Sequence, residues 1–222
     1  MRQRANCIPD WNVDDRVRRI VETTSFKCFL SFEDELRQFR SVISHVVNCF
    51  DENSFSFNFG PPSNRSTLIY GLEDVVYILG LPIDGNPVTG CELGDNTIVY
   101  QNMLGSVPDA KYIDGRRLKL CWLKNNFQTV PEAIDDHELW YFVRAYILYI
   151  LGCVFVDSSA PTVSPMYLQL LVDKETINGY AWGAAMLTYL LHSLKHFKVK
   201  KEMKTIKGFI FPLFVSIIFF PL

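Results

Sequence analysis

The chain has 222 residues, of which 49% are hydrophobic and 21% charged, so it can bury a substantial core as one large domain or two small ones. This composition excludes an intrinsically disordered protein. A formal net charge of −2 also excludes a strong overall basic field, so any contact with nucleic acid would need a local patch of basic residues.

Two amphipathic helices are predicted within residues 12–50. Val13, Val17 and Ile20 recur at helical spacing, and the same spacing resumes from Leu36 after an acidic stretch. A short β-hairpin is predicted next, near residues 55–70, where two segments rich in strand-forming residues flank a Gly-Pro-Pro sequence.

Residues 71–90 form the most regularly patterned segment of the sequence. Apolar residues recur at helical spacing over residues 72–79, and Gly80 ends this run. Residues 82–87 then contain two turn sequences, Pro82-Ile-Asp-Gly85 and Asn86-Pro87. Both favour turns because glycine supplies a positive φ angle and proline fixes φ. This pattern predicts a short helix followed by a backbone that turns twice.

Helical spacing marks most of the remaining chain. The strongest candidate is a helix at 139–151, which must be nearly surrounded by protein because its only charged member is Arg144. The other predicted elements are a surface loop at 91–114, a helix at 116–127, a loop at 152–165, a brief helix at 166–172 and a long last helix over 180–194. Without internal repeats, the sequence predicts a mainly α, single helical domain with a small β-hairpin.

Six cysteines are spread along the chain without the close pairs that a zinc site uses. Residues 1–10 also lack the apolar run of a secretory signal peptide. Both observations favour a reducing compartment in which the thiols are free.

Three features have a functional interpretation beside a structural one. His192 and His196 have the spacing of two metal ligands on one helix face, but no third ligand is visible nearby, so a structural role is favoured. The acidic residues within 135–138 are better explained as a helix cap than as paired catalytic acids. Trp182 is interpreted as core packing and not as a stacking platform for a ring.

Arg144 needs a partner, because a guanidinium in an apolar helix should meet a carboxylate, a carbonyl or a bound anion. We expect a structural ion pair, with Asp157 or Asp173 as the carboxylate. A ligand site at Arg144 is the alternative.

No standard enzyme motif is present in the sequence, whether for dinucleotides, for a phosphate loop, for a nucleophile elbow or for a zinc protease. The sequence Gly94-Asp95-Asn96 resembles a fragment of a metallophosphatase, yet the accompanying Asp and His motifs are missing. Catalysis is therefore the minority interpretation, and neither a cofactor nor a metal is expected.

The C-terminal part combines six lysines between residues 195 and 207 with an apolar run over residues 208–222. A helix of that run is shorter than a hydrocarbon core about 30 Å thick and contains prolines, so a membrane span is not favoured. Residues 214–222 are interpreted as a divergent hydrophobic tail, for which a gene model that reads into an intron is one explanation.

Residues 72–90 resemble the hallmark L-x-D-V-x-x-L-L-G-L-P-[IV]-D-G-x-P-V-T-G of the plant mobile domain, a family also labelled aminotransferase-like. Segments 55–59, 144–152 and 179–185 resemble the family's T-F-H-L strand, R-A-Y-L-L-Y-L-L-G helix and Y-[AS]-W-G-[AS]-A helix in the same order. The domain is expected to span residues 12–213 and to be incomplete.

The family-motif positions are candidates for a functional surface or for the core. They are Asp74, Gly80, Pro82, Asp84, Gly85, Pro87, Gly90, Arg144, Tyr146, Gly152, Tyr180, Trp182 and Gly183. No catalytic residues are carried over from the family. The aminotransferase label would require a Schiff-base lysine in a much larger phosphate-binding fold, and the sequence has no such setting.

The resemblance implies a nuclear plant protein, similar to the maintenance-of-meristems group, that acts in meristem maintenance, gene-expression control and transposon silencing. Because a segment that turns twice builds a rigid surface suited to binding, we expect the protein to act there as a non-catalytic interaction module. The implied partners are proteins, phosphatase-like or chromatin-associated, and direct contact with nucleic acid is left open. An enzyme, either a transferase or a phosphatase-associated subunit, with Arg144 and the Asp157 loop near its site, and a protein anchored to a membrane by its tail, are the alternatives.

Overall fold

The structure is a computed structural model that describes residues 11–31, 45–92, 94–155, 160–199 and 213. The helical elements are α1 (Asp15–Val21), η2 (Lys27–Ser31), α3 (Leu72–Leu79), α4 (Thr97–Leu104), η4 (Ala110–Tyr112), α5 (Leu120–Phe127), α6 (Asp136–Val154), η5 (Pro165–Leu170), α7 (Lys174–Asn178) and α8 (Trp182–Val199). The strands are β1 (Phe50–Asp51), β2 (Ser56–Phe59), β3 (Ser66–Leu68), β4 (Ile113–Asp114), β5 (Arg117–Lys119) and β6 (Thr162–Val163). The prediction of a mainly α domain with a small hairpin is confirmed.

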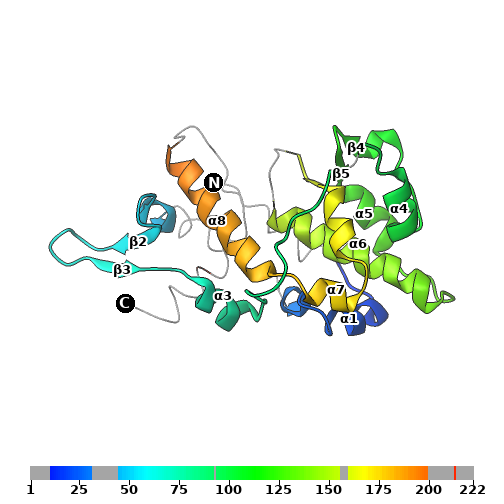
Figure 1. Cartoon of the computed structure of the whole chain (residues 1–222), viewed down its shortest axis with the longest axis horizontal. Coiled ribbons are helices and arrows are strands. Elements are labelled where there is room, and N and C mark those ends of the chain that lie inside the picture. Colours follow the sequence, from blue (N-terminus) through cyan, green and yellow to red (C-terminus); the bar gives the residue numbers. More distant parts are fainter. Residues whose placement is uncertain (1–10, 32–44, 93, 156–159, 200–212, 214–222) are drawn as a thin grey trace.

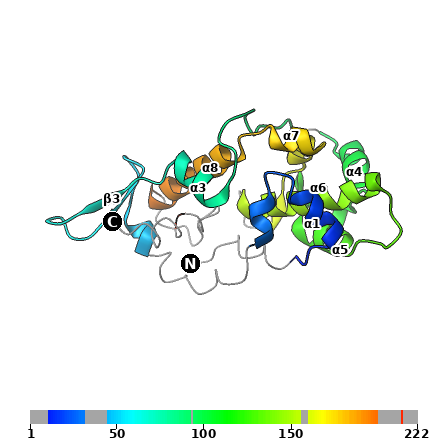
Figure 2. The same cartoon turned by 90° about the horizontal axis from the view of Figure 1, so that it is seen from below.

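The described elements form an elongated arrangement (Figure 1). The β2–β3 hairpin projects at one end, α4 and α5 lie at the other, and α8 runs between them. Figure 2 shows α3 beside α8 and α1 beside α6, and both pairs are in contact.

Helix α6 is the centre of the core. All its residues from Val143 to Val154 are buried, and it contacts α1, α4, α5, β6 and η5. Its start is capped as expected, because the Asp135 carboxylate accepts a hydrogen bond from the Glu138 N–H at 2.7 Å. Burying each large aliphatic side chain contributes roughly 1.5–3 kcal/mol, so this helix is a principal source of stability.

Two antiparallel sheets flank the helices. The predicted hairpin is present with Phe57 opposite Leu68, and β1 adds a third strand to it. A second hairpin, β4–β5, replaces the start of the helix expected at 116–127, because Gly115 turns the chain with a φ of 62°. Strand β6 then pairs with β5.

Several further elements differ from the sequence prediction. Helix α4 lies within the expected surface loop and exposes Ile98 (71%), so it lacks the apolar stripe by which helices are recognised. Helix α7 was not predicted, and η5 is a 3₁₀ helix. The first helix expected within residues 12–50 is present as α1, and the 3₁₀ helix η2 follows it without having been predicted. Most of the second, residues 32–44, lies outside the described residues.

The prediction of free thiols holds for four cysteines and is wrong for a fifth. Residues 28, 49, 91 and 121 are free, whereas Cys153 on α6 is disulfide-bonded. Spacing along the sequence does not show which cysteines approach each other in space. Over the same described ranges, no helix has the length and apolar character needed to cross a membrane. Residues 214–222 are outside them, so the interpretation of the tail stays a prediction.

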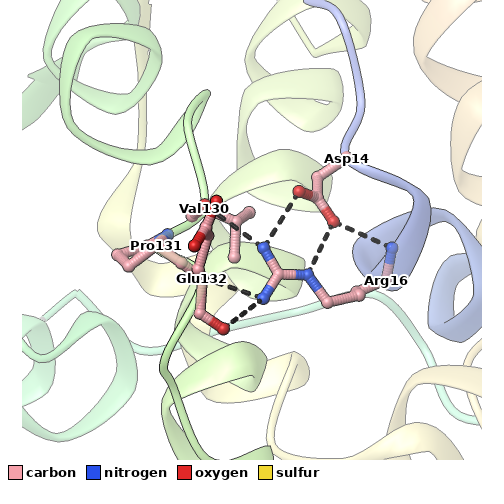
Figure 3. Close-up of polar contacts among 5 residues, drawn as sticks. All are labelled: Asp14, Arg16, Val130, Pro131 and Glu132. Carbon is pink, nitrogen blue, oxygen red and sulfur yellow. Dashed lines mark hydrogen bonds and ion pairs between the residues drawn. The ribbon is translucent and has the colours of Figure 1, made fainter.

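Arg16 links α1 to the loop between α5 and α6 through hydrogen bonds (Figure 3). Its guanidinium donates to both carboxylate oxygens of Asp14, each at 3.1 Å, and to the main-chain carbonyls of Val130 (3.2 Å), Pro131 (2.8 Å) and Glu132 (3.3 Å). Asp14 also caps α1 by accepting from the Arg16 N–H at 2.9 Å. One pair of neighbouring side chains thus joins two segments more than 100 residues apart.

This contact predicts a pH-dependent contribution to stability. The Arg16 hydrogen bonds lower the pKa of Asp14, so the contribution is present above the unfolded carboxyl value of about 3.9 and is lost as the pH falls through the folded value. Replacing Arg16 with methionine is expected to lower the urea midpoint at about pH 7 and to lower it less at about pH 3, where the carboxylate contribution has declined and the loss of the three carbonyl bonds remains. Arg19→Met, an exposed change on the same helix, is the control. An equal loss from Arg16→Met at both pH values would contradict this assignment.

Candidate binding groove

The segment that follows α3, residues 80–91 and here called the turn segment, lies against the start of α8. Its backbone forms an isolated parallel bridge in which Asn86 is paired with Tyr180. Three hydrogen bonds join the two backbones: Asn86 N to Gly179 O (2.8 Å), Ala181 N to Asn86 O (3.0 Å) and Gly183 N to Pro82 O (2.8 Å). The turn segment therefore satisfies N–H groups at the start of α8 that have no acceptor inside the helix.

Two glycines permit this close contact. Gly85 has a φ of 124°, and a Cβ atom placed there would lie 2.5 Å from the Gly179 carbonyl oxygen. A Cβ atom on Gly183 would lie 2.9 Å from a methyl group of Val75 and 3.0 Å from the Pro82 carbonyl oxygen. Larger residues at either position would push the turn segment away from α8.

An apolar groove of about 520 Å³ lies where the turn segment, the end of α6, η5 and α8 meet. Its lining residues are Pro87, Val88, Thr89, Phe155, Tyr167, Ala181, Ala184, Ala185, Thr188, Tyr189 and His192. Phe155 is stacked on Tyr167, with ring centroids 5.5 Å apart, and meets the edge of Tyr189 at 5.3 Å. The lining therefore combines an aromatic cluster with small side chains from one face of α8.

The groove carries few ionisable groups. Among the described residues, its lining contains two tyrosines and His192 but no carboxylate, lysine or thiol. General acid–base chemistry needs a group that titrates near the working pH beside the reacting atom, and covalent chemistry needs an activated nucleophile. The lining has shape and apolar surface for binding, but it does not assemble either constellation.

The structure divides the family-motif residues among several roles. Pro87 lines the groove, while Pro82, Gly85, Tyr180 and Gly183 belong to the backbone contact behind it. Gly90 packs on Met166, and Asp84 is exposed.

The remaining motif residues hold the helices in place. Asp74 and Gly80 cap the two ends of α3. Trp182 is fully buried, as expected, and donates its indole N–H to the Ile177 carbonyl at 2.7 Å. Tyr146 is buried on α6, and Gly152 lets α6 approach Leu120.

Within the described part of the chain, Arg144 is paired with carbonyls and not with a carboxylate. Its side chain donates to Leu171 O (2.9 Å), Val172 O (2.7 Å) and Met103 O (3.4 Å), at the ends of η5 and α4. The ion pair expected with Asp173 is wrong: both residues are described and no salt bridge joins them. Asp157 lies outside the described residues. Helix-end carbonyls carry partial negative charge and lack partners, so they replace the expected carboxylate.

The histidine pair of α8 and the Gly94-Asp95-Asn96 sequence do not form a catalytic or metal site within the described residues. The rings of His192 and His196 are stacked 6.2 Å apart, and the described ranges contain no group of three residues that could hold a metal ion. Asp95 accepts from the Thr97 N–H (2.8 Å) and hydroxyl (2.6 Å), and these bonds lower its pKa. The Gly94-Asp95-Asn96 sequence therefore precedes α4 as a local turn.

Sequence reasoning did not identify the groove itself. Its aromatic residues come from three segments, at Phe155, Tyr167 and Tyr189, and no spacing rule joins residues so far apart. The available signal was the run of small residues in α8 beside Tyr189, which predicts close packing but not an open groove.

Comparison with known proteins places most of the chain in one family model. Residues 35–215 match the model described as plant mobile domain. No solved structure matches the chain.

Curated relatives come from Arabidopsis thaliana. Protein MAIN-LIKE 2 is 32% identical over 196 residues, 87% of this chain and 28% of that protein. Protein MAINTENANCE OF MERISTEMS is 31% identical over 195 residues, 86% of this chain and 40% of that protein. A serine/threonine-protein phosphatase 7 long form homolog is 33% identical over 169 residues, 76% of this chain and 12% of that protein. The chain thus spans well under half of the length of each relative.

Proposed function

The chain belongs to the plant mobile domain family, and we propose that it is a nuclear, non-catalytic interaction module that acts in meristem maintenance, gene-expression control and transposon silencing. The observation that carries this proposal is the meeting of family-motif segments at one apolar groove. The turn segment and the start of α8 match the family hallmark sequences, and both contribute lining residues.

The geometry of the groove favours binding over turnover. A backbone ladder fixes the turn segment, so this part of the surface is organised before a partner arrives, and less conformational entropy is lost on binding. An apolar lining with few convergent polar groups is typical of a recognition site.

The names of the relatives suggest where such a module works. One is named for the maintenance of meristems and another is named as a phosphatase homolog, so a phosphatase-like protein is one proposed companion. A chromatin-associated companion is proposed from the silencing role and not from these names. Association with a phosphatase-like protein as its subunit is the second candidate function, and the phosphatase-named relative is the observation that favours it.

The test is affinity purification of the tagged chain from nuclei of growing plant tissue. Thr188 is exposed and lines the groove, so Thr188→Trp should fill the groove and reduce recovery of the bound companions at least about tenfold. Thr129→Trp, at an exposed position between α5 and α6, is the matched control and should leave recovery unchanged.

Two outcomes would contradict the proposal. One is recovery of neither a chromatin-associated nor a phosphatase-like companion with the wild-type chain. The other is a set of companions that Thr188→Trp leaves unaltered while circular dichroism shows both variants folded. Fractionation of the same tissue tests the membrane alternative, which predicts that the chain sediments with membranes and not with nuclei.

A further inference from the structure

We propose that the groove binds a short segment of a partner protein in which an apolar or aromatic anchor is followed by acidic side chains. This inference rests on the proposed interaction function and specifies the chemistry of the partner. It follows from two features of α8: the apolar half of its exposed face lines the groove, and the next turn of the same face is basic.

The apolar half of the α8 face provides the binding position for the apolar or aromatic anchor of the partner segment. Ala181, Ala184 and Ala185 leave the backbone of α8 accessible, and Phe155 with Tyr189 provides rings in an edge-to-face pair at 5.3 Å. A volume of about 520 Å³ accommodates a large aliphatic or aromatic side chain together with neighbouring backbone. Aromatic anchors in such a groove gain both buried area and ring contacts.

Lys195 on the second half of this face sets the sign of the charge that follows. His192 lines the groove, and Lys195 and His196 continue the same face one turn later. The rings of His192 and His196 are nearly parallel, at 18°, so the two imidazoles are aligned along this face. Helix α8 contains no aspartate or glutamate between Trp182 and Val199, and the described residues that line the groove include none either. An acidic segment is therefore attracted and a basic one is repelled.

A protein segment fits this surface better than a nucleic acid strand does. Binding of single-stranded nucleic acid requires a basic track that follows several phosphates. On the described part of α8, Lys198 donates to the Asn48 carbonyl at 2.9 Å, whereas Lys195, with its ammonium group 5.0 Å from the centroid of the Phe55 ring, is exposed and accessible to an acidic segment. Among the described residues, the positive charge beside the groove is therefore limited to a short stretch of α8, while four further lysines between residues 200 and 207 lie outside the described part of the chain.

The test is fluorescence anisotropy of the full chain with labelled synthetic peptides of about a dozen residues. The main probe carries one tryptophan or leucine followed by three glutamates, and the comparison probes replace the glutamates with glutamines or with lysines. We expect the glutamate probe to bind at least about tenfold more tightly than the glutamine probe, and the difference to shrink as salt is raised.

Variants separate the two halves of the surface. Thr188→Trp should abolish binding of every probe. His192→Glu should weaken the glutamate probe about tenfold and leave the glutamine probe nearly unchanged. His137→Glu is the matched control: His137 is exposed at the opposite end of α6, about 27 Å along the helix from Phe155, and should have no effect.

Each contrary result has a separate meaning. Equal binding of the glutamate and glutamine probes would contradict the proposal that the partner segment is acidic. Peptide binding that Thr188→Trp does not alter would contradict the proposal that the groove is the binding site. Tighter binding of a single-stranded oligonucleotide than of any peptide would replace the protein segment with nucleic acid. If no peptide binds although Thr188→Trp abolishes capture of nuclear companions, the interaction function stands and this partner chemistry is wrong.

Discussion

Replacing Arg144 with methionine is expected to lower the free energy of unfolding by about 3 kcal/mol, measured by urea denaturation. Arg144 is buried on α6 and donates to the carbonyls of Leu171, Val172 and Met103. Methionine fills a similar volume but leaves these three acceptors facing an apolar side chain. Burial already lowers the pKa of the guanidinium, so its hydrogen bonds offset a real desolvation cost that the variant also removes.

The matched variants test whether geometry or charge is responsible. Arg144→Lys keeps the charge but replaces a planar fork with a single ammonium group, which cannot reach carbonyls from two helix ends at once, so a loss of about 1–2 kcal/mol is expected. Arg19→Met removes an exposed arginine from α1 and should change stability by less than about 0.5 kcal/mol. If Arg144→Met is as stable as Arg19→Met, the carbonyl contacts do not stabilise the fold.

The same residue shows where sequence reasoning stops. The apolar pattern around Arg144 indicated burial and the need for a partner, and both are present in the structure. The predicted partner of Arg144 was wrong. The acceptors are main-chain carbonyls at two helix ends that approach each other only in the folded chain, and the residue types in the sequence do not reveal such acceptors.

Local signals predicted local structure. The helix at 72–79 and the hairpin near 55–70 depend on residues close in sequence, and the structure has both. The β4–β5 hairpin had such a signal in Asp114-Gly115, and α4 had one in Gly105, which ends it with a φ of 66°. The weak apolar periodicity of α4 concealed that signal.

The groove depends on contacts between distant segments. Its lining residues are separated by up to about 100 positions along the chain, and the backbone ladder that positions Pro87 beside Ala181 appears only after folding. The glycines of the hallmark sequence nevertheless indicated that the backbone must turn there. The structure adds the reason for one of them, because the turn at Gly85 brings the chain against the carbonyl of Gly179.

Gly85→Ala is accordingly expected to be among the most damaging single changes in this chain. The new methyl group would lie 2.5 Å from the Gly179 oxygen, and the backbone would have to keep a φ of 124° that residues with a side chain rarely adopt. Relief of the clash breaks the hydrogen bond from Asn86 to Gly179, so we expect a loss of about 3–4 kcal/mol in the free energy of unfolding.

Two other glycines make the comparison specific. Gly80 has a φ of 63° and open space within 4 Å of the position that an alanine methyl group would take, so Gly80→Ala should cost about 1 kcal/mol from the backbone angle alone. Gly94 has open space and no positive φ, so Gly94→Ala should be neutral or stabilising by less than about 1 kcal/mol. Urea unfolding of the three variants should therefore rank the losses in the order 85, 80, 94. A Gly85→Ala variant no less stable than Gly80→Ala would show that the turn segment can move off α8 freely, and the groove would then lack the fixed wall on which its binding role depends.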